Sequence, residues 1–188
     1  MKIAVLVSGS GSNLQAIIDA IESQYLSNVE ISVVIADRKC YATERADKHG
    51  IKSLTLSRKD DAMFDVIDRE TACCDLIVLA GFLSIIPKDF CQKRERGIIN
   101  LHPALLPKYG GVGMYGDNVH KAVLANKEKE TGATVHYVTE GVDEGEIILQ
   151  KSFPLTADET MDSLKEKLHS IEHQLIVDAV QQISKKYV

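Results

Sequence analysis

An asparagine and a histidine two positions apart are the residues of this sequence best suited to chemistry. Asn100 and His102 end an apolar run, and Pro103 follows directly. Side chains two apart in a strand project from the same side, so both are expected to face one ligand. Histidine exchanges protons near neutral pH, and an amide N–H stabilises a developing oxyanion. The pattern favours catalysis; the alternative is a structural pair beside a proline turn that contains Leu106–Pro107, a candidate cis peptide.

A carboxylate that would serve this histidine follows the alternating segment Thr134–Thr139. Asp143 stands in a turn between Gly141 and Gly145. A carboxylate in contact with His102 would hold the imidazole in one tautomer and raise its pKa. Aspartate is also common in turns for structural reasons. Only the fold decides whether the two side chains meet.

The loop Ser8–Asn13 has the composition of an anion site. It follows a short apolar run and contains glycines that permit close backbone approach, before a predicted helix whose first N–H groups favour negative charge. Ser12 and Asn13 add side-chain donors. The loop predicts phosphate binding, and Ser12 is also expected to cap the helix with Gln15 in a capping box. The third glycine of a dinucleotide fingerprint is replaced by Leu14, which argues against NAD.

The elements that carry these residues alternate between strands and helices. Continuous Val- and Ile-rich runs predict strands buried on both faces of a parallel sheet, at Ile3–Val7, Val29–Ala36, Asp75–Ala80 and Gly97–Leu101. Helical patterns lie between them at Ser12–Tyr25, Tyr41–His49 and Asp60–Ala72. The order predicts a doubly wound, mostly parallel α/β sheet, with the site at the carboxyl ends of its strands.

The second half departs from this alternation. Thr134–Thr139 and Glu146–Pro154 both read as strands, and the short loop between them predicts an antiparallel pair. A long C-terminal helix is expected to begin at a capping box, Thr156–Glu159. Its apolar stripe contains Met161, Leu164, Leu168, Ile171, Leu175, Ala179 and Ile183.

Composition narrows the class of protein. There are 22 Lys and Arg against 27 Asp and Glu, a formal charge of -5 that disfavours nucleic-acid binding. Hydrophobic residues make up 45% of the chain, which is ordinary for a globular protein. No repeat or linker divides residues 1–188, so one domain is expected. The four cysteines and six histidines lack zinc-ligand spacing, which predicts free thiols and no metal. The first apolar run is too short for a signal peptide or membrane span, so we expect a cytoplasmic protein.

Three segments together resemble one enzyme family over essentially the whole chain. Ser8–Asn13, Asn100–Lys108 and Gly132–Gly145 occur in the same order in phosphoribosylglycinamide formyltransferases, the folate-dependent enzymes of purine biosynthesis. The Asn-x-His-Pro-x-Leu-Leu-Pro motif is typical of folate formyltransferases, and the Gly-x-Gly-Ser-Asn loop of the glycinamide ribonucleotide members. The resemblance implies a Rossmann-like formyltransferase fold, with residues 1–100 as the phosphate-binding half and 101–188 as the folate-binding and catalytic half.

The resemblance also implies a reaction and a set of site residues. The amine of glycinamide ribonucleotide attacks the formyl carbon of 10-formyltetrahydrofolate directly, without a metal. Asn100, His102 and Asp143 are implied to be catalytic. The implied ribonucleotide contacts are Gly11, Ser12, Asn13, His169 and Glu172. The implied folate contacts are Leu83, Ser84, Ile85, Ile86, Asn100, Thr139, Glu140, Gly141, Val142 and Asp143.

Several positions depart from the family pattern. A longer, glycine-rich loop, Gly110–Gly116, replaces a Pro-Gly step and is either a flap or an insertion. The arginine that often binds the folate tail has no clear counterpart, and Arg58 or Lys59 is the candidate substitute. For His169 a solvated helix surface is the alternative, and His136 is expected to be structural.

Other functions stay open on the sequence alone. A methionyl-tRNA formyltransferase would carry a further domain and a basic surface, and a formyl-folate hydrolase a regulatory domain. A catalytically silent nucleotide-binding module would keep the anion loop while the catalytic trio failed to converge. The resemblance permits either a monomer or a homodimer with small-molecule substrates only.

Overall fold

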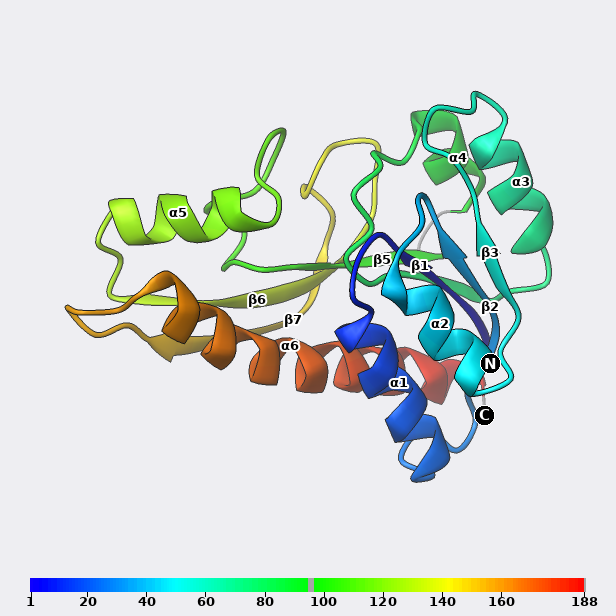
Figure 1. Ribbon diagram of the computed structural model, residues 1–188, viewed down its shortest axis with the longest axis horizontal. Coiled ribbons are helices and arrows are strands. Elements are labelled where there is room, and N and C mark those ends of the chain that lie inside the picture. The colour runs from blue at the N-terminus through cyan, green and yellow to red at the C-terminus, as the bar shows by residue number, and fades with distance from the viewer. Residues whose placement is uncertain (95–96, 188) are drawn as a thin grey trace.

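A computed structural model describes residues 1–94 and 97–187 as one mixed sheet flanked by helices (Figure 1). The strands are β1 (Lys2–Val7), β2 (Glu30–Ala36), β3 (Ser53–Thr55), β4 (Leu76–Leu79), β5 (Ile98–His102), β6 (Glu130–Tyr137) and β7 (Ile147–Pro154). The helices are α1 (Ser12–Glu22), α2 (Tyr41–Lys48), α3 (Met63–Glu70), α4 (Lys88–Lys93), α5 (Asp117–Ala125) and α6 (Met161–Ser184), followed by the 3₁₀ turn η1 (Lys185–Tyr187).

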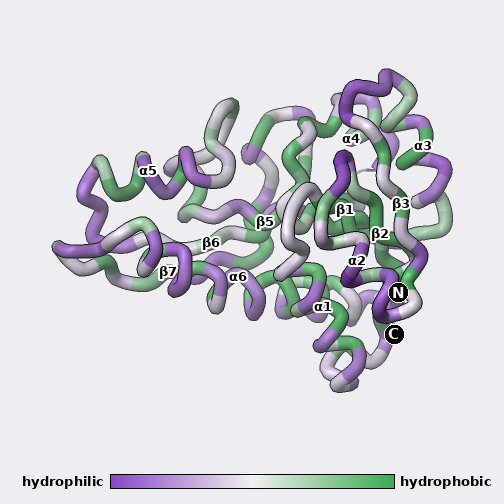
Figure 2. Tube along the Cα trace, in the orientation of Figure 1, coloured by the Kyte–Doolittle hydropathy of each residue, from purple (hydrophilic) through white to green (hydrophobic). Residues whose placement is uncertain are grey.

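The strand order is β3-β2-β1-β4-β5-β6-β7, parallel from β3 through β5. Alternate residues of β1 enter different cores. Val5 packs with residues of α1 and α6, whereas Leu6 packs with residues of α3 and α4. Burial on both faces explains the unbroken apolar runs, which Figure 2 shows gathered along β1 and β2. The predicted doubly wound sheet is confirmed.

Strand β6 runs opposite to both of its neighbours, β5 and β7, and its antiparallel pairing with β7 is the one that the short connecting loop predicted. The β5–β6 register places Asn100 opposite His136 and His102 opposite Thr134. This pairing brings the second half of the chain directly against the strand that carries the candidate catalytic residues.

One predicted helix start and one predicted helix cap are wrong. Helix α6 begins at Met161 with a capping box between Thr160 and Ser163, later than the Thr156–Glu159 box that was expected. The side chain of Glu159 does accept from the backbone of Thr156 at 3.2 Å, but in a turn that precedes the helix. Local spacing identified a real hydrogen bond and assigned it to the wrong element.

Helix α1 begins without a side-chain cap. Its N-cap is Gly11, in the left-handed region at φ 74°, so Ser12 is already the first helical residue and caps nothing. A Cβ at Gly11 would lie 2.7 Å from the Cβ of Ala42, so this glycine permits both the turn and the approach of α2. The free N–H groups of the first turn therefore stay available at the carboxyl edge of the sheet.

The sequence did not predict the short elements β3 and α4.

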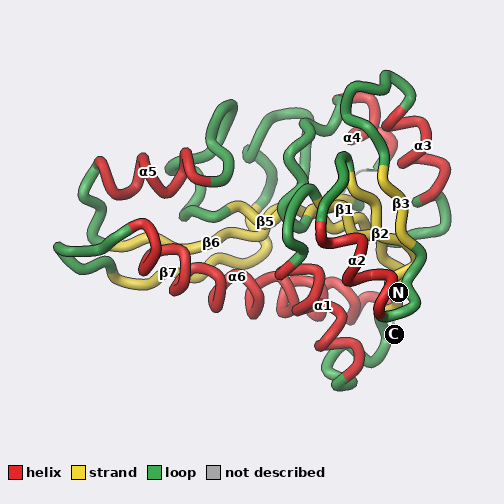
Figure 3. The backbone as a smooth tube through the Cα atoms, in the orientation of Figure 1, coloured by secondary structure: helices red, strands yellow, loops and turns green. Residues whose placement is uncertain are grey.

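The prediction of free thiols is confirmed, since all four cysteines are free. No helix within the described residues has both the length and the apolar character needed to cross a membrane. Figure 3 shows long loops gathered between α4 and α5, close to β5 in this view.

Candidate active site

Asn100 and His102 lie at the carboxyl end of β5, as their spacing predicted. His102 is 3% exposed, because β6 packs beside it and the turn after Pro103 folds over it. The peptide bond between Leu106 and Pro107 is cis, as expected. The side chain of Thr134 fixes this turn by donating to the Ala104 carbonyl at 2.6 Å and accepting from the Leu106 N–H at 3.1 Å.

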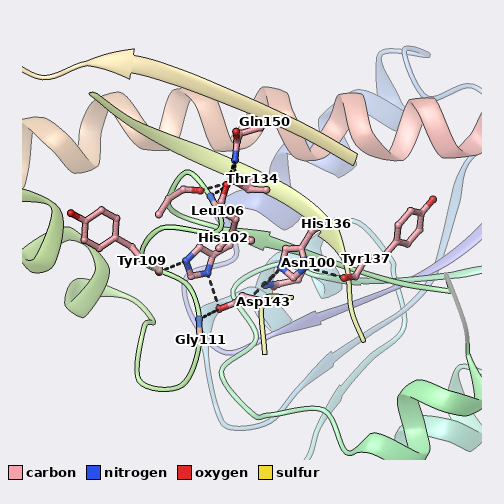
Figure 4. Close-up of polar contacts among 11 residues, drawn as sticks. Asn100, His102, Leu106, Tyr109, Gly111, Thr134, His136, Tyr137, Asp143 and Gln150 are labelled. Carbon is pink, nitrogen blue, oxygen red and sulfur yellow. Dashed lines mark hydrogen bonds and ion pairs between the residues drawn. The ribbon is translucent and has the colours of Figure 1, made fainter. Parts of the chain in front are cut away.

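The two ring nitrogens of His102 have different partners (Figure 4). Nε2 lies 2.7 Å from the carbonyl oxygen of Tyr109, and Nδ1 lies 3.4 Å from Oδ2 of Asp143. A carbonyl only accepts, so Nε2 carries a proton and donates it to Tyr109. Nδ1 is therefore the nitrogen that gains or loses a proton, and it faces a carboxylate.

Asp143 meets His102, which the sequence alone left open. Its backbone is in the left-handed region at φ 59°, and its Oδ2 also accepts from the Gly111 N–H at 3.0 Å. Oδ1 lies 3.5 Å from Nε2 of His136. Burial alone would raise the pKa of Asp143, but its neighbours His136, His102 and the Gly111 N–H together lower it. The carboxylate is held in its ionised form.

Asp143 does raise the pKa of His102, as expected, but the net shift of that pKa is downward. Burial lowers the pKa of His102, and this effect exceeds the opposing effects of Asp143 and the Tyr109 carbonyl. Sequence reasoning counted the carboxylate but not the loss of solvent around the ring. The lowered pKa favours the neutral imidazole of His102 at neutral pH, beside the ionised carboxylate of Asp143.

His136 is a site residue that sequence reasoning classed as structural support. Its Nδ1 lies 2.9 Å from the Tyr137 carbonyl and therefore carries a proton, which leaves Nε2 as an acceptor. Asn100 donates to this Nε2 through Nδ2 at 3.2 Å. The contact orients the Asn100 amide and leaves its second N–H free to donate. The strand register that makes His136 face Asn100 was the missing signal.

The predicted ribonucleotide contacts gather where α1 begins beside α6. Asn13 has a buried Oδ1 without a hydrogen-bond partner, next to the uncapped helix start. Glu172 of α6 lies close enough for a side-chain hydrogen bond with Asn13, and burial raises its pKa to about 7. His169 is on the exposed side of the same helix, stacked on His173 with ring centroids 6.2 Å apart. A ligand at this position would meet donors at one end and Glu172 at the other.

Glu172 makes a testable contribution to pH-dependent stability. A carboxyl whose pKa rises from 4.5 to about 7 on folding binds more protons in the native state, so stability falls as pH rises through that window. At 9% exposure the full loss is on the order of 3 kcal/mol. We expect Glu172→Gln to gain about 2–3 kcal/mol in unfolding free energy relative to the parent between about pH 5 and about pH 8. Urea denaturation at both pH values measures this.

Glu166→Gln, which changes an exposed carboxylate of the same helix, is the matched control for Glu172→Gln. Parallel pH profiles for Glu172→Gln and the parent would contradict the buried-carboxyl interpretation.

The two segments expected to bind folate lie near each other at the edge of the site. Leu83 and Ile85 are 46% and 67% exposed. The Leu83 N–H donates to Ser8 at 2.8 Å, and the Ser84 hydroxyl donates to Asp37 at 2.6 Å, which fixes this loop to the ends of β1 and β2.

The second folate segment adjoins an open cavity. Gln92 of α4, the helix that follows residues 83–86, donates to Glu140 of the second segment at 2.6 Å. A cavity of about 470 Å³ adjoins Asp143 and is lined by Leu106, Pro107, Gly110, Gly111, Val142, Asp143, Glu144, Gly145 and Ile147. The backbone of Arg58 donates to Asp37, which anchors the loop that carries both candidate tail cations. Among residues 1–94 and 97–187, no group of three or more His, Cys, Asp or Glu side chains is placed to hold a metal ion.

This fold and this site match a known family of enzymes. The family described as formyl transferase matches residues 1–180, so the chain belongs to the formyl transferase family. It is 40% identical to phosphoribosylglycinamide formyltransferase of Dictyostelium discoideum, over 98% of both chains. It is 42% identical to the trifunctional purine biosynthetic protein adenosine-3 of Drosophila melanogaster, over 92% of this chain but 13% of that protein. Glycinamide ribonucleotide transformylase 1 from Symbiobacterium toebii superposes with a TM-score of 0.90 at 32% identity, over 99% of this chain and 88% of that one.

Proposed function

We propose that this chain transfers the formyl group of 10-formyltetrahydrofolate to the amine of glycinamide ribonucleotide, a step of purine biosynthesis. The observation that carries the proposal is the convergence of Asn100, His102 and Asp143. Asp143 lies 3.4 Å from His102 and 3.5 Å from His136, and His136 in turn lies 3.2 Å from Asn100. A silent binding module would not require this convergence. The uncapped start of α1 beside Glu172 supplies a place for a phosphorylated acceptor, which a hydrolase using water would not need.

The proposed roles follow from the hydrogen-bond donors and acceptors that each side chain offers to a bound substrate. When bound, 10-formyltetrahydrofolate supplies a formyl carbon on N10, and transfer breaks that C–N bond while a new one forms to the acceptor amine. The second N–H of Asn100 donates to the formyl oxygen, where negative charge develops. Nδ1 of His102 takes the proton that the amine loses and returns it to the departing nitrogen. Charge and atoms therefore balance without a metal.

Asp143 and Tyr109 act through His102 in this scheme. The Tyr109 carbonyl keeps the other ring nitrogen protonated, so the proton in transit always uses Nδ1. Asp143 stabilises the imidazolium that forms on the way. Both substrates must be held in register for the amine to reach the formyl carbon, and this positioning contributes much of the acceleration.

The proposed binding contacts are those that the resemblance implied. Gly11, Ser12 and Asn13 would hold the phosphate through backbone and side-chain donors. Glu172 would contact the ribonucleotide. The segments 83–86 and 139–143 would hold the folate beside the cavity next to Asp143. We propose small-molecule partners only and a cytoplasmic site of action.

Formyl transfer with purified protein tests the proposal. We expect loss of the folate formyl group only when glycinamide ribonucleotide is present, with the formylated ribonucleotide as product by mass spectrometry. Deformylation that does not depend on the ribonucleotide would instead identify a hydrolase. Absence of turnover with either acceptor would favour a silent binding module.

A further inference from the structure

Helix α5 carries a buried histidine that neither the catalytic scheme nor the predicted substrate contacts use. His120 is 7% exposed, at a position flanked along the helix by the apolar side chains of Val119 and Val123. A polar ring in such a position is normally hydrogen-bonded. Its Nδ1 is buried and has no hydrogen-bond partner among the described residues.

The charged and titratable groups around His120 place it between the catalytic histidine and α6. Its charge neighbours are His102 of β5, Asp117 of its own helix, and Lys165 and His169 of α6. Lys165 pairs with Asp117 at 2.6 Å and ties the start of α5 to α6. His120 therefore lies within electrostatic range of both His102 and the part of α6 that carries Lys165 and His169.

A buried nitrogen without a partner requires explanation. Leaving such a group unsatisfied costs free energy, and the buried Oδ1 of Asn13, at the proposed phosphate site, is unsatisfied in the same way among the described residues. Burial and the neighbouring cations lower the pKa of His120, with only Asp117 opposing, so the ring is neutral and has one acceptor nitrogen at neutral pH. A neutral ligand group with an N–H would complete its hydrogen bonding.

We propose that His120 positions the acceptor substrate by hydrogen bonding, through Nδ1, to the glycinamide end of the ribonucleotide. This inference rests on the proposed function. The phosphate would lie at Gly11–Asn13, so the opposite end of the same molecule must reach the formyl carbon beside His102. His102 is one of the groups whose charge acts on His120, so His120 is near enough to hold that end.

The test compares two substitutions at this position, one that keeps an aromatic ring without nitrogens and one that is smaller but polar. His120→Phe removes both nitrogens, and His120→Asn restores a polar atom near the position of Nδ1. One lost hydrogen bond to a substrate predicts an increase of about tenfold or more in the KM and the calorimetric Kd for glycinamide ribonucleotide in His120→Phe. The KM for 10-formyltetrahydrofolate is expected to stay within about twofold, because His120 has no role at the folate segments. His120→Asn is expected to recover most of the ribonucleotide affinity.

Val123→Ala, which alters another buried position of α5, controls for a general loosening of the helix. An unchanged ribonucleotide Kd in a folded His120→Phe protein would overturn the proposal. So would an equal loss in His120→Asn, or a matching loss in Val123→Ala, since these would indicate packing. If the parent protein is active, any of these results overturns the role of His120 and leaves the proposed function intact. A parent protein that neither binds nor formylates the ribonucleotide would overturn both the role of His120 and the proposed function.

Discussion

Replacing His102 with alanine is expected to lower kcat for formyl transfer by about a thousandfold, within the range for loss of a general acid–base group. The reason is geometric, because Nδ1 of His102 is the ring nitrogen that faces Asp143 while the Tyr109 carbonyl occupies the other. Alanine leaves no group to accept the proton from the substrate amine. The rate of formyl loss from the folate under saturating conditions, with product identified by mass spectrometry, measures the effect.

The matched control for His102→Ala is His49→Ala. His49 is the C-cap of α2, and its side chain contacts Glu22 at 2.7 Å and Gln15 at 3.1 Å, not His102 or Asp143. This variant should retain full activity. Binding of glycinamide ribonucleotide by His102→Ala, measured by calorimetry, should change little, because the proposed role is in the chemical step. A His102→Ala protein that retains a tenth of the parent rate or more would remove His102 from the mechanism.

The parallel part of the fold was predictable because burial on both faces leaves a clear pattern. The runs predicted at Ile3–Val7 and Val29–Ala36 correspond to β1 and β2 within one residue at each end. β3 has three residues and an exposed end, so it carries no comparable apolar run. The start of α6 was misplaced because two Thr-containing boxes lie in succession and tertiary packing selects the second.

The candidate site was predictable as a set of residues but not as a network. Motif and strand-end position singled out Asn100, His102 and Asp143. The partners that orient them came from register and loop geometry: His136 faces Asn100 across β5 and β6, and the Tyr109 contact is made by a backbone carbonyl. Every residue has a backbone carbonyl, so the sequence does not indicate which one will contact His102. The net direction in which the pKa of His102 shifts likewise depends on burial, which the spacing of residues in the sequence does not reveal.

The carboxylate of Asp143 is expected to matter nearly as much as the imidazole. In Asp143→Asn the side chain keeps its shape and one oxygen to accept from Gly111, but the negative charge beside His102 is lost. The imidazolium formed during proton transfer then has no counter-charge in a buried site. We expect kcat to fall by about a hundredfold or more.

The pH profile of Asp143→Asn distinguishes this electrostatic role from simple misfolding. Asp143 opposes the effect of burial on His102, so removing its charge lowers the pKa of His102 further. The acid limb of kcat/KM, where His102 must be neutral to accept a proton, should therefore move to lower pH while the maximum falls. Asp158→Asn, at an exposed position outside the site, should leave both features unchanged. A reduced maximum without that shift would mean that Asp143 acts on loop geometry through Gly111 rather than on the proton at His102.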